Sequence, residues 1–184
     1  MNGLVTVLRA ADAAARWHVN QRRKGAAQEP YVTHLLEVAM LVAEATAGAD
    51  PNLVVAALLH DTIEDQGVTP EEIATQFNDD VADLVVEVTD NMKLPKAERK
   101  QLQIKNAPKL TPRAKILKLT DNSNLRSLAT SPPADWPMQH RIDYVIWTTE
   151  VVRGLRGASA LLEQEFDRAA AHAERTIPLA AERG

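Results

Sequence analysis

The chain has 184 residues and a formal net charge of −4, a length that suits one globular domain and a charge that disfavours general nucleic-acid binding. It contains no cysteine, which excludes disulfides and thiolate metal sites, so any metal must be held by histidine and carboxylate groups. No apolar run is long enough to cross a bilayer and no signal-peptide pattern is evident, so we expect a cytoplasmic protein without a membrane partner.

Helical periodicity runs through almost the whole chain. Apolar side chains recur at steps of three and four residues, and no segment alternates with period two for long enough to form a strand. The predicted helices cover residues 4–21, 31–46, 51–65, 70–77, 79–89, 96–106, 111–129, 137–155 and 157–175, with a polar loop between the first two. We therefore predict an all-α fold, a single domain over residues 1–184 built as a bundle of roughly eight to ten helices.

Two of the predicted helices begin with recognisable capping residues. Asp50 stands directly before Pro51, which places an N-cap side chain ahead of a proline at the first helical position. Thr69 is followed by Pro70 and then, three residues after the threonine, by Glu72, which is the pattern of a capping box.

Positive charge is concentrated in one segment of this acidic chain, between residues 93 and 118. Glu98 is the only acid within that segment. A local positive field suits a small, highly anionic ligand, and the alternative is a solvated helix face rich in lysine. The cations are Lys93, Lys96, Arg99, Lys100, Lys105, Lys109, Arg113, Lys115 and Lys118.

An adjacent His60-Asp61 pair follows the apolar run of residues 53–59, and two acids, Glu64 and Asp65, come four residues later. On the predicted helix, positions i and i+4 share a face, so His60 stacks with Glu64 and Asp61 with Asp65. Burying such ionisable groups at one end of an apolar helix is costly unless they pair or bind a metal.

Two further residues complete a candidate metal site. His34 lies on the preceding predicted helix, and Asp121 follows the mostly apolar stretch 116–120. A mixed set of nitrogen and oxygen ligands suits Mn²⁺, Fe²⁺, Co²⁺ or Zn²⁺ better than Mg²⁺. A His-Asp pair by itself is more often a surface ion pair or a helix cap, so the prediction depends on the combination. The candidate ligands are His34, His60, Asp61 and Asp121.

Further motifs accompany these ligands along the chain. They are residues 21–24, 29–34, 57–65, 94–100 and 118–121, together with Tyr144, Trp147 and residues 154–157. This set resembles the small alarmone hydrolases, the MESH1-like group of HD-domain phosphohydrolases among the RelA/SpoT homologues. The resemblance extends over nearly the whole chain, from residue 8 to residue 162.

The resemblance implies an HD fold, one Mn²⁺, and hydrolysis of the 3′-pyrophosphate of (p)ppGpp to GDP or GTP and pyrophosphate. That is the activity of a guanosine-3′,5′-bis(diphosphate) 3′-pyrophosphohydrolase. It assigns the metal to the four candidate ligands, and it assigns catalysis to Glu64 and Asp65, which would orient or deprotonate the attacking water. Because the chain ends too soon for a synthetase domain, we expect hydrolysis and no synthesis.

The same resemblance places several residues at the substrate. Arg23 and Lys24 match a loop that holds the guanine and a nearby phosphate, since an arginine plane stacks on a base and a lysine meets a phosphate as a point charge. The alternative for both is a solvated basic loop. Lys96 matches a phosphate-binding lysine with the same alternative. Tyr144 matches a tyrosine near the substrate, for which a core tyrosine is the alternative.

One departure from the family pattern lies after Asp121. The family has three residues between this aspartate and an Asn-Leu-Arg triplet, whereas here only Asn122 and Ser123 precede Asn124. On a regular helix the missing residue turns Asn124, the matching substrate residue, by roughly 100°. Either the contact is lost, or a local change in winding restores it, or one of the two preceding residues takes its place.

Other functions remain open at this stage. An HD phosphohydrolase with a different nucleotide substrate, such as the 2′-phosphate of NADPH, fits the same ligands. A non-catalytic alarmone-binding protein is a second alternative, against which the pair of Glu64 and Asp65 argues. A helical protein with no site is the third. The sequence indicates no oligomeric state, because no additional apolar stripe stands out.

Overall fold

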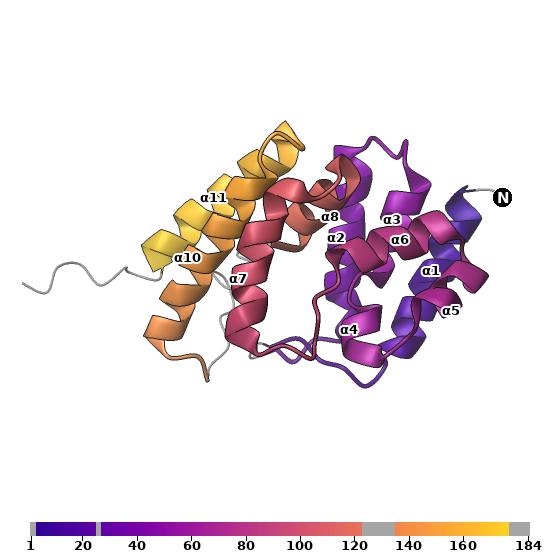
Figure 1. The fold of residues 1–184 in the computed structure, drawn as a ribbon, viewed down its shortest axis with the longest axis horizontal. Coiled ribbons are helices and arrows are strands. Elements are labelled where there is room, and N and C mark those ends of the chain that lie inside the picture. The colour runs from indigo at the N-terminus through magenta and orange to yellow at the C-terminus, as the bar shows by residue number, and fades with distance from the viewer. Residues whose placement is uncertain (1–2, 25–26, 123–134, 177–184) are drawn as a thin grey trace, which may run out of the picture.

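The computed structural model describes residues 3–24, 27–122 and 135–176, and every regular element within them is a helix (Figure 1). The elements are α1 (Gly3–Trp17), α2 (Val32–Ala45), α3 (Pro51–Leu59), α4 (Thr62–Gln66), α5 (Pro70–Gln76), α6 (Asp79–Val88), α7 (Lys96–Asn106), the 3₁₀ helix η1 (Ala107–Lys109), α8 (Pro112–Asn122), α10 (Met138–Leu155) and α11 (Ala160–Thr176). The prediction of an all-α helical fold is confirmed. In this part of the chain the extended backbone forms only one isolated bridge, between Arg22 and Pro30.

Helix α8 joins two apolar clusters. Ala114 and Leu117 belong to the cluster formed with α1, α2, α3, α5 and α6, whereas Leu119 belongs to the cluster formed with α10 and α11. Figure 1 shows α2 and α8 in the middle of the molecule, between these two groups of helices. Because α8 is packed from both sides, its last turn, which carries Asp121, has a fixed position.

The capping residues predicted from the sequence form the expected hydrogen bonds. The Asp50 side chain accepts the amide of Leu53 at 3.0 Å, and Thr69 and Glu72 form a complete capping box. Arg113 of α8 also donates to Asp50, at 2.7 Å, and to Asp80 of α6 at the same distance. The start of α3 is thereby tied to both α6 and α8.

None of the described helices combines the length and the apolar character that a bilayer-spanning segment needs.

Gly154 allows α10 to lie directly against η1. A Cβ atom at this position would come within 2.8 Å of the Pro108 side chain and 3.0 Å of its backbone nitrogen. Alanine gains about 1 kcal/mol of helix propensity over glycine, but overpacking against backbone costs about 1–3 kcal/mol. We therefore expect Gly154→Ala to lower the free energy of unfolding in a denaturant titration. Arg153→Ala, an exposed change one residue earlier, serves as the control, and equal stability of the two variants would contradict the close approach.

Candidate active site

The helix predicted for residues 51–65 is interrupted at the His60-Asp61 pair, which corrects the expectation of one continuous helix. Helix α3 ends at Leu59 and α4 begins at Thr62. The carbonyl of Ala57 would accept the amide of Asp61 in a continuous helix, but it accepts a hydrogen bond from Nδ1 of His60 at 2.8 Å. The histidine side chain thus takes the place of a backbone donor, and the helix stops where the site begins.

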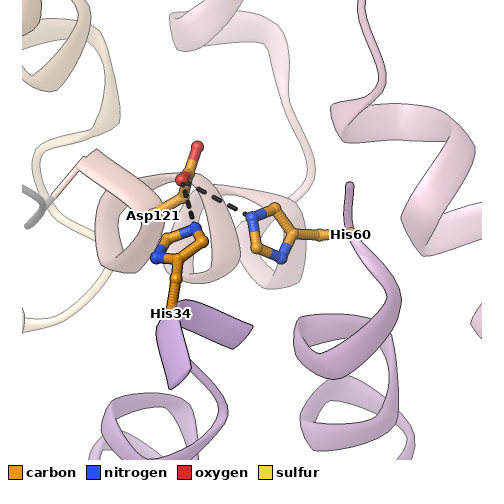
Figure 2. Close-up of side chains that lie close together, drawn as sticks. All are labelled: His34, His60 and Asp121. Atoms are coloured by element: carbon orange, nitrogen blue, oxygen red, sulfur yellow. Dashed lines mark ion pairs between the residues drawn. The ribbon is translucent and has the colours of Figure 1, made fainter. Parts of the chain in front are cut away.

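The four predicted ligands converge at the junction of α2, α3 and α8. Nε2 of His34 lies 3.6 Å from a carboxylate oxygen of Asp61 and 3.6 Å from one of Asp121. Nε2 of His60 lies 3.1 Å and 3.5 Å from the same two oxygens. Figure 2 shows His34, His60 and Asp121 pointing toward one another from three different elements, and their ligand atoms lie within 4.8 Å of each other.

These side chains fit a divalent transition metal. Two bonds of about 2.1 Å at right angles separate the ligand atoms by about 3 Å, close to the separations seen here. Because a carbonyl only accepts, the bond to Ala57 fixes the proton on Nδ1 of His60 and turns Nε2 toward the carboxylates. That Nε2 atom is fully buried and makes no hydrogen bond of good geometry to any described residue. A buried nitrogen with this orientation is suited to be a metal ligand.

Charge within the ligand set is balanced by the pairing of imidazoles and carboxylates. Burial would lower the pKa of His34 and His60, but the carboxylates of Asp61 and Asp121 outweigh it and raise the pKa of both. Burial acts in the opposite direction on the aspartates, where the imidazoles hold the pKa of both carboxyls below the usual range. The site therefore favours ionised carboxylates, the form that binds a cation.

Tyr31 supports one of the predicted ligands, Asp61, although this contact was not predicted from the sequence. Its hydroxyl donates to Asp61 at 2.5 Å, and it binds the same carboxylate oxygen that faces both histidines. The tyrosine lies immediately before α2, so the helix that carries His34 also positions this hydroxyl. The signal in the sequence was the position of Tyr31, three residues before the candidate ligand His34. A tyrosine of the hydrophobic core can occupy the same position, so periodicity alone does not identify this role.

Removing the Tyr31 hydroxyl is expected to weaken metal binding without unfolding the protein. Tyr31→Phe retains the ring that stacks on His18 at 5.3 Å but leaves Asp61 free to rotate. Loss of such an outer hydrogen bond commonly costs 10–100-fold in affinity, and we expect a rise of that size in the dissociation constant for Mn²⁺ measured by calorimetry. An unchanged dissociation constant for Mn²⁺ in Tyr31→Phe would show that His34 and His60 are sufficient to hold Asp61 in place.

Glu64 lies half-buried beside the ligand set. Its carboxylate accepts the backbone amide of Asp90 at 2.5 Å. Burial raises the pKa of Glu64 to about 7, against the lowering effect of that hydrogen bond. A carboxyl group with this pKa can take up and release a proton near neutral pH, as general acid–base catalysis requires.

Asp65 lies on the same short helix, and burial raises the pKa of its carboxyl as well. One of its oxygens accepts the side-chain amide of Gln21 at 2.7 Å. Both predicted catalytic acids therefore lie on α4, next to the ligands but with hydrogen-bond partners of their own.

Lys118 is the one member of the basic segment that faces the acidic site in the described structure. Its ammonium lies 3.7 Å from Asp121 and 3.4 Å from the carbonyl of Val88. Burial would lower the pKa of this lysine, but the negative charges of Asp121, Asp90 and Glu64 outweigh it and raise the pKa. Lys118 thus offsets part of the negative charge around the ligands.

A cavity of about 210 Å³ lies between α7 and α10. It brings together Lys24, Lys96 and Tyr144, which were predicted as substrate contacts from three distant parts of the sequence. The remaining lining residues, which sequence reasoning did not assign to the substrate, are Asp90, Arg99, Lys100, Gln103, Trp136, His140 and Trp147. Asp90 is both a lining residue and the partner of Glu64, so it connects the cavity with a predicted catalytic acid.

Arg23, another predicted substrate contact, is not among the residues that line this cavity. Arg23 forms an ion pair with Glu37 of α2 at 2.7 Å. Asn124 lies outside the described residues. Asn122 is buried and donates to the carbonyl of Lys118 at 2.6 Å, which directs it into its own helix and away from a substrate.

Comparisons with known proteins agree with this geometry. Residues 10–146 match the family model described as the HD domain. The chain is 44% identical over 162 residues to the guanosine-3′,5′-bis(diphosphate) 3′-pyrophosphohydrolase MESH1 of Xenopus tropicalis, covering 88% of this chain and 90% of that protein. It is also 44% identical over 160 residues to the human MESH1 protein, covering 86% of this chain and 89% of that protein.

A solved structure shares the fold. It is described as a metazoan orthologue of SpoT that hydrolyses ppGpp and plays a role in starvation responses. The two chains superpose with a TM-score of 0.86 and are 40% identical, and the match covers 89% of this chain and 93% of the other. The chain therefore belongs to the HD-domain family and, within it, to the MESH1 group.

Proposed function

We propose that this chain hydrolyses (p)ppGpp at its 3′-pyrophosphate, releasing GDP or GTP and pyrophosphate. One juxtaposition carries the proposal: two histidines and two aspartates converge beside two acids, and one of these acids, Glu64, binds the backbone of Asp90, which also lines a cavity of cations and aromatic rings. Relatives at 44% identity bear the name of this activity, which supports its extension to this chain.

We assign His34, His60, Asp61 and Asp121 as the ligands of one divalent ion, with Mn²⁺ as the expected metal. The mixture of imidazole and carboxylate donors supports this choice. When bound there, the ion supplies charge neutralisation for the pyrophosphate and lowers the pKa of a water molecule. Tyr31 and the carbonyl of Ala57 orient two of these ligands through their hydrogen bonds.

We assign the proton transfers to Glu64 and Asp65. In the reaction a water oxygen attacks phosphorus, the bond between phosphorus and the ribose 3′-oxygen breaks, and that oxygen takes up a proton. Glu64, with a pKa of about 7, is suited to move a proton at neutral pH. Asp65, which is more exposed, is suited to orient the attacking water.

We assign substrate binding to the residues that line the cavity. Lys24 and Lys96 both line the cavity, where they can meet phosphate oxygens as point charges. Lys100 lies 4.6 Å above the ring of Trp147, so the cavity wall already combines a cation with an aromatic face. Arg23, whose partner is Glu37, and Asn124 are retained as candidate contacts on the strength of the family resemblance.

The proposal is tested by incubating the purified chain with ppGpp and Mn²⁺ and measuring GDP and pyrophosphate together. We expect equal amounts of the two products, and none after addition of a chelator. NADPH, tested in parallel, separates the proposed activity from removal of a 2′-phosphate. Release of phosphate from NADPH without products from ppGpp would overturn the substrate assignment. Tight binding of ppGpp without turnover would identify a sensor.

A further inference from the structure

Gln21 lies in the loop between α1 and α2. Its amide donates to the carbonyl of His18 at 2.9 Å, and its own carbonyl accepts the amide of Tyr31 at 3.0 Å. The backbone of Gln21 is thus held on both sides, and its position does not depend on the loop that follows.

The side chain of Gln21 reaches the second acid of α4. Nε2 of Gln21 donates to Asp65 at 2.7 Å. Its Oε1 accepts from Gln66 at 2.6 Å and lies 2.6 Å from Nδ1 of His18. An ionised carboxylate only accepts, so the amide group of Gln21 must face Asp65, and its oxygen must face the other two partners.

This arrangement occupies one oxygen of Asp65, and among the described residues none forms a hydrogen bond with the other oxygen. Asp65 is carried by a helix of five residues, bounded by the His60-Asp61 turn on one side and by Gly67, in the left-handed conformation, on the other. Such a short element has little packing of its own to fix a side-chain rotamer. The bond from Gln21, which is anchored through the buried His18, supplies that constraint.

We infer that Gln21 is a positioning residue for the reaction, which holds Asp65 in the orientation required for turnover. The inference rests on the proposed function, since it assumes that Asp65 acts in hydrolysis. It assigns to the loop after α1 a part in catalysis that does not involve contact with the substrate or the metal.

Gln21→Glu is the sharpest test, because it preserves the size of the side chain and the oxygen that faces His18 and Gln66 but replaces the donor to Asp65 with a second carboxylate oxygen. Loss of a positioning hydrogen bond commonly lowers activity 10–100-fold. We expect a fall of that size in kcat for ppGpp, with KM within about twofold of the parent value and with unchanged Mn²⁺ content. Asn52→Asp provides the matched control, because it removes an amide-to-carboxylate bond of 2.8 Å at the far end of α3.

A double-mutant cycle separates positioning from a structural effect. If Gln21 acts only through Asp65, Gln21→Glu should cause no further loss of kcat in the Asp65→Asn background. The same loss in both backgrounds would overturn the inference and assign Gln21 to the stability of the fold. Full activity of Gln21→Glu beside an inactive Asp65→Asn would also overturn it. Full activity of Asp65→Asn would instead contradict the catalytic role proposed for Asp65.

Discussion

Replacing Glu64 with glutamine is expected to lower kcat for ppGpp by about 10²–10⁴-fold, the range that a general acid–base group contributes. The substitution keeps an oxygen that can accept the amide of Asp90, so the local backbone should remain in place. It removes a group whose pKa of about 7 allows proton exchange at neutral pH. Metal content should remain at the parent level, because Glu64 lies outside the four converging ligands.

The same substitution is expected to raise the stability of the metal-free protein at pH 8. A carboxyl whose pKa is raised on folding costs stability once the pH rises above its ordinary pKa of 4.5, and the full cost is reached above about 7. Glutamine has no charged form to bury. After allowance for partial solvent exposure, the gain should be about 1–2 kcal/mol in a denaturant titration with chelator present.

Glu150→Gln is the control for both measurements, because it neutralises an exposed acid of α10 paired with Arg153. Its kcat and stability should match those of the parent. If Glu64→Gln retained full turnover, the proton transfer would have to be assigned to Asp65 alone. If it lost metal together with activity, Glu64 would be a ligand and not an acid–base group.

Replacing His60 with alanine is expected to remove most of the bound metal. His60 places Nε2 3.1 Å from Asp61 and 3.5 Å from Asp121, so its loss removes a proposed ligand and leaves the two carboxylates with one shared imidazole, that of His34, instead of two. Because outer hydrogen bonds alone commonly contribute 10–100-fold to metal affinity, the loss of a ligand should cost more than about 100-fold. Metal content after dialysis, measured by elemental analysis, gives the result directly.

His60 is buried and caps the carbonyl of Ala57, so its removal also affects the end of α3. Asp121→Asn provides a second variant that keeps side-chain shape and weakens the same site. His172→Ala, on α11, removes a histidine outside the candidate site and should retain full metal content. A folded His60→Ala protein with the parent metal content would show that the ligand set has been assigned incorrectly.

Local sequence signals predicted the helices better than they predicted the exact connection between them. Asp50 and Thr69 mark helix starts through side-chain bonds to nearby amides, which depend only on local sequence. The break after Leu59 was missed because residues 53–65 have uniformly helical character, and only the ring of His60, bonded to Ala57, shows why the helix stops.

The basic segment, residues 93–118, shows a second limit of prediction from the sequence. Lys96 and Lys100 line the cavity, as the concentration of positive charge suggested. Arg113, on α8, instead forms ion pairs with Asp50 and Asp80. These cations lie on two different helices, α7 and α8, so the packing of the helices and the partners from distant segments determine which cations face the cavity. For the same reason the contact between Gln21 and Asp65, separated by 44 residues, follows from the tertiary fold and not from a local pattern.

Metal uptake by this chain is expected to release protons. Against the effect of burial, the carboxylates of Asp61 and Asp121 raise the pKa of both imidazoles, that of His60 well above its ordinary value. A protonated ring nitrogen has no lone pair for a cation, so each imidazole must lose its proton as the ion enters, and the affinity for the ion falls with falling pH. When the ion leaves, two protonated imidazoles offset the negative charge of the two carboxylates, as the divalent cation did before. The helices around the site therefore carry no uncompensated buried charge in either state. Mild acid should therefore strip the ion reversibly, and neutral buffer with fresh Mn²⁺ should restore the loaded enzyme without a refolding step.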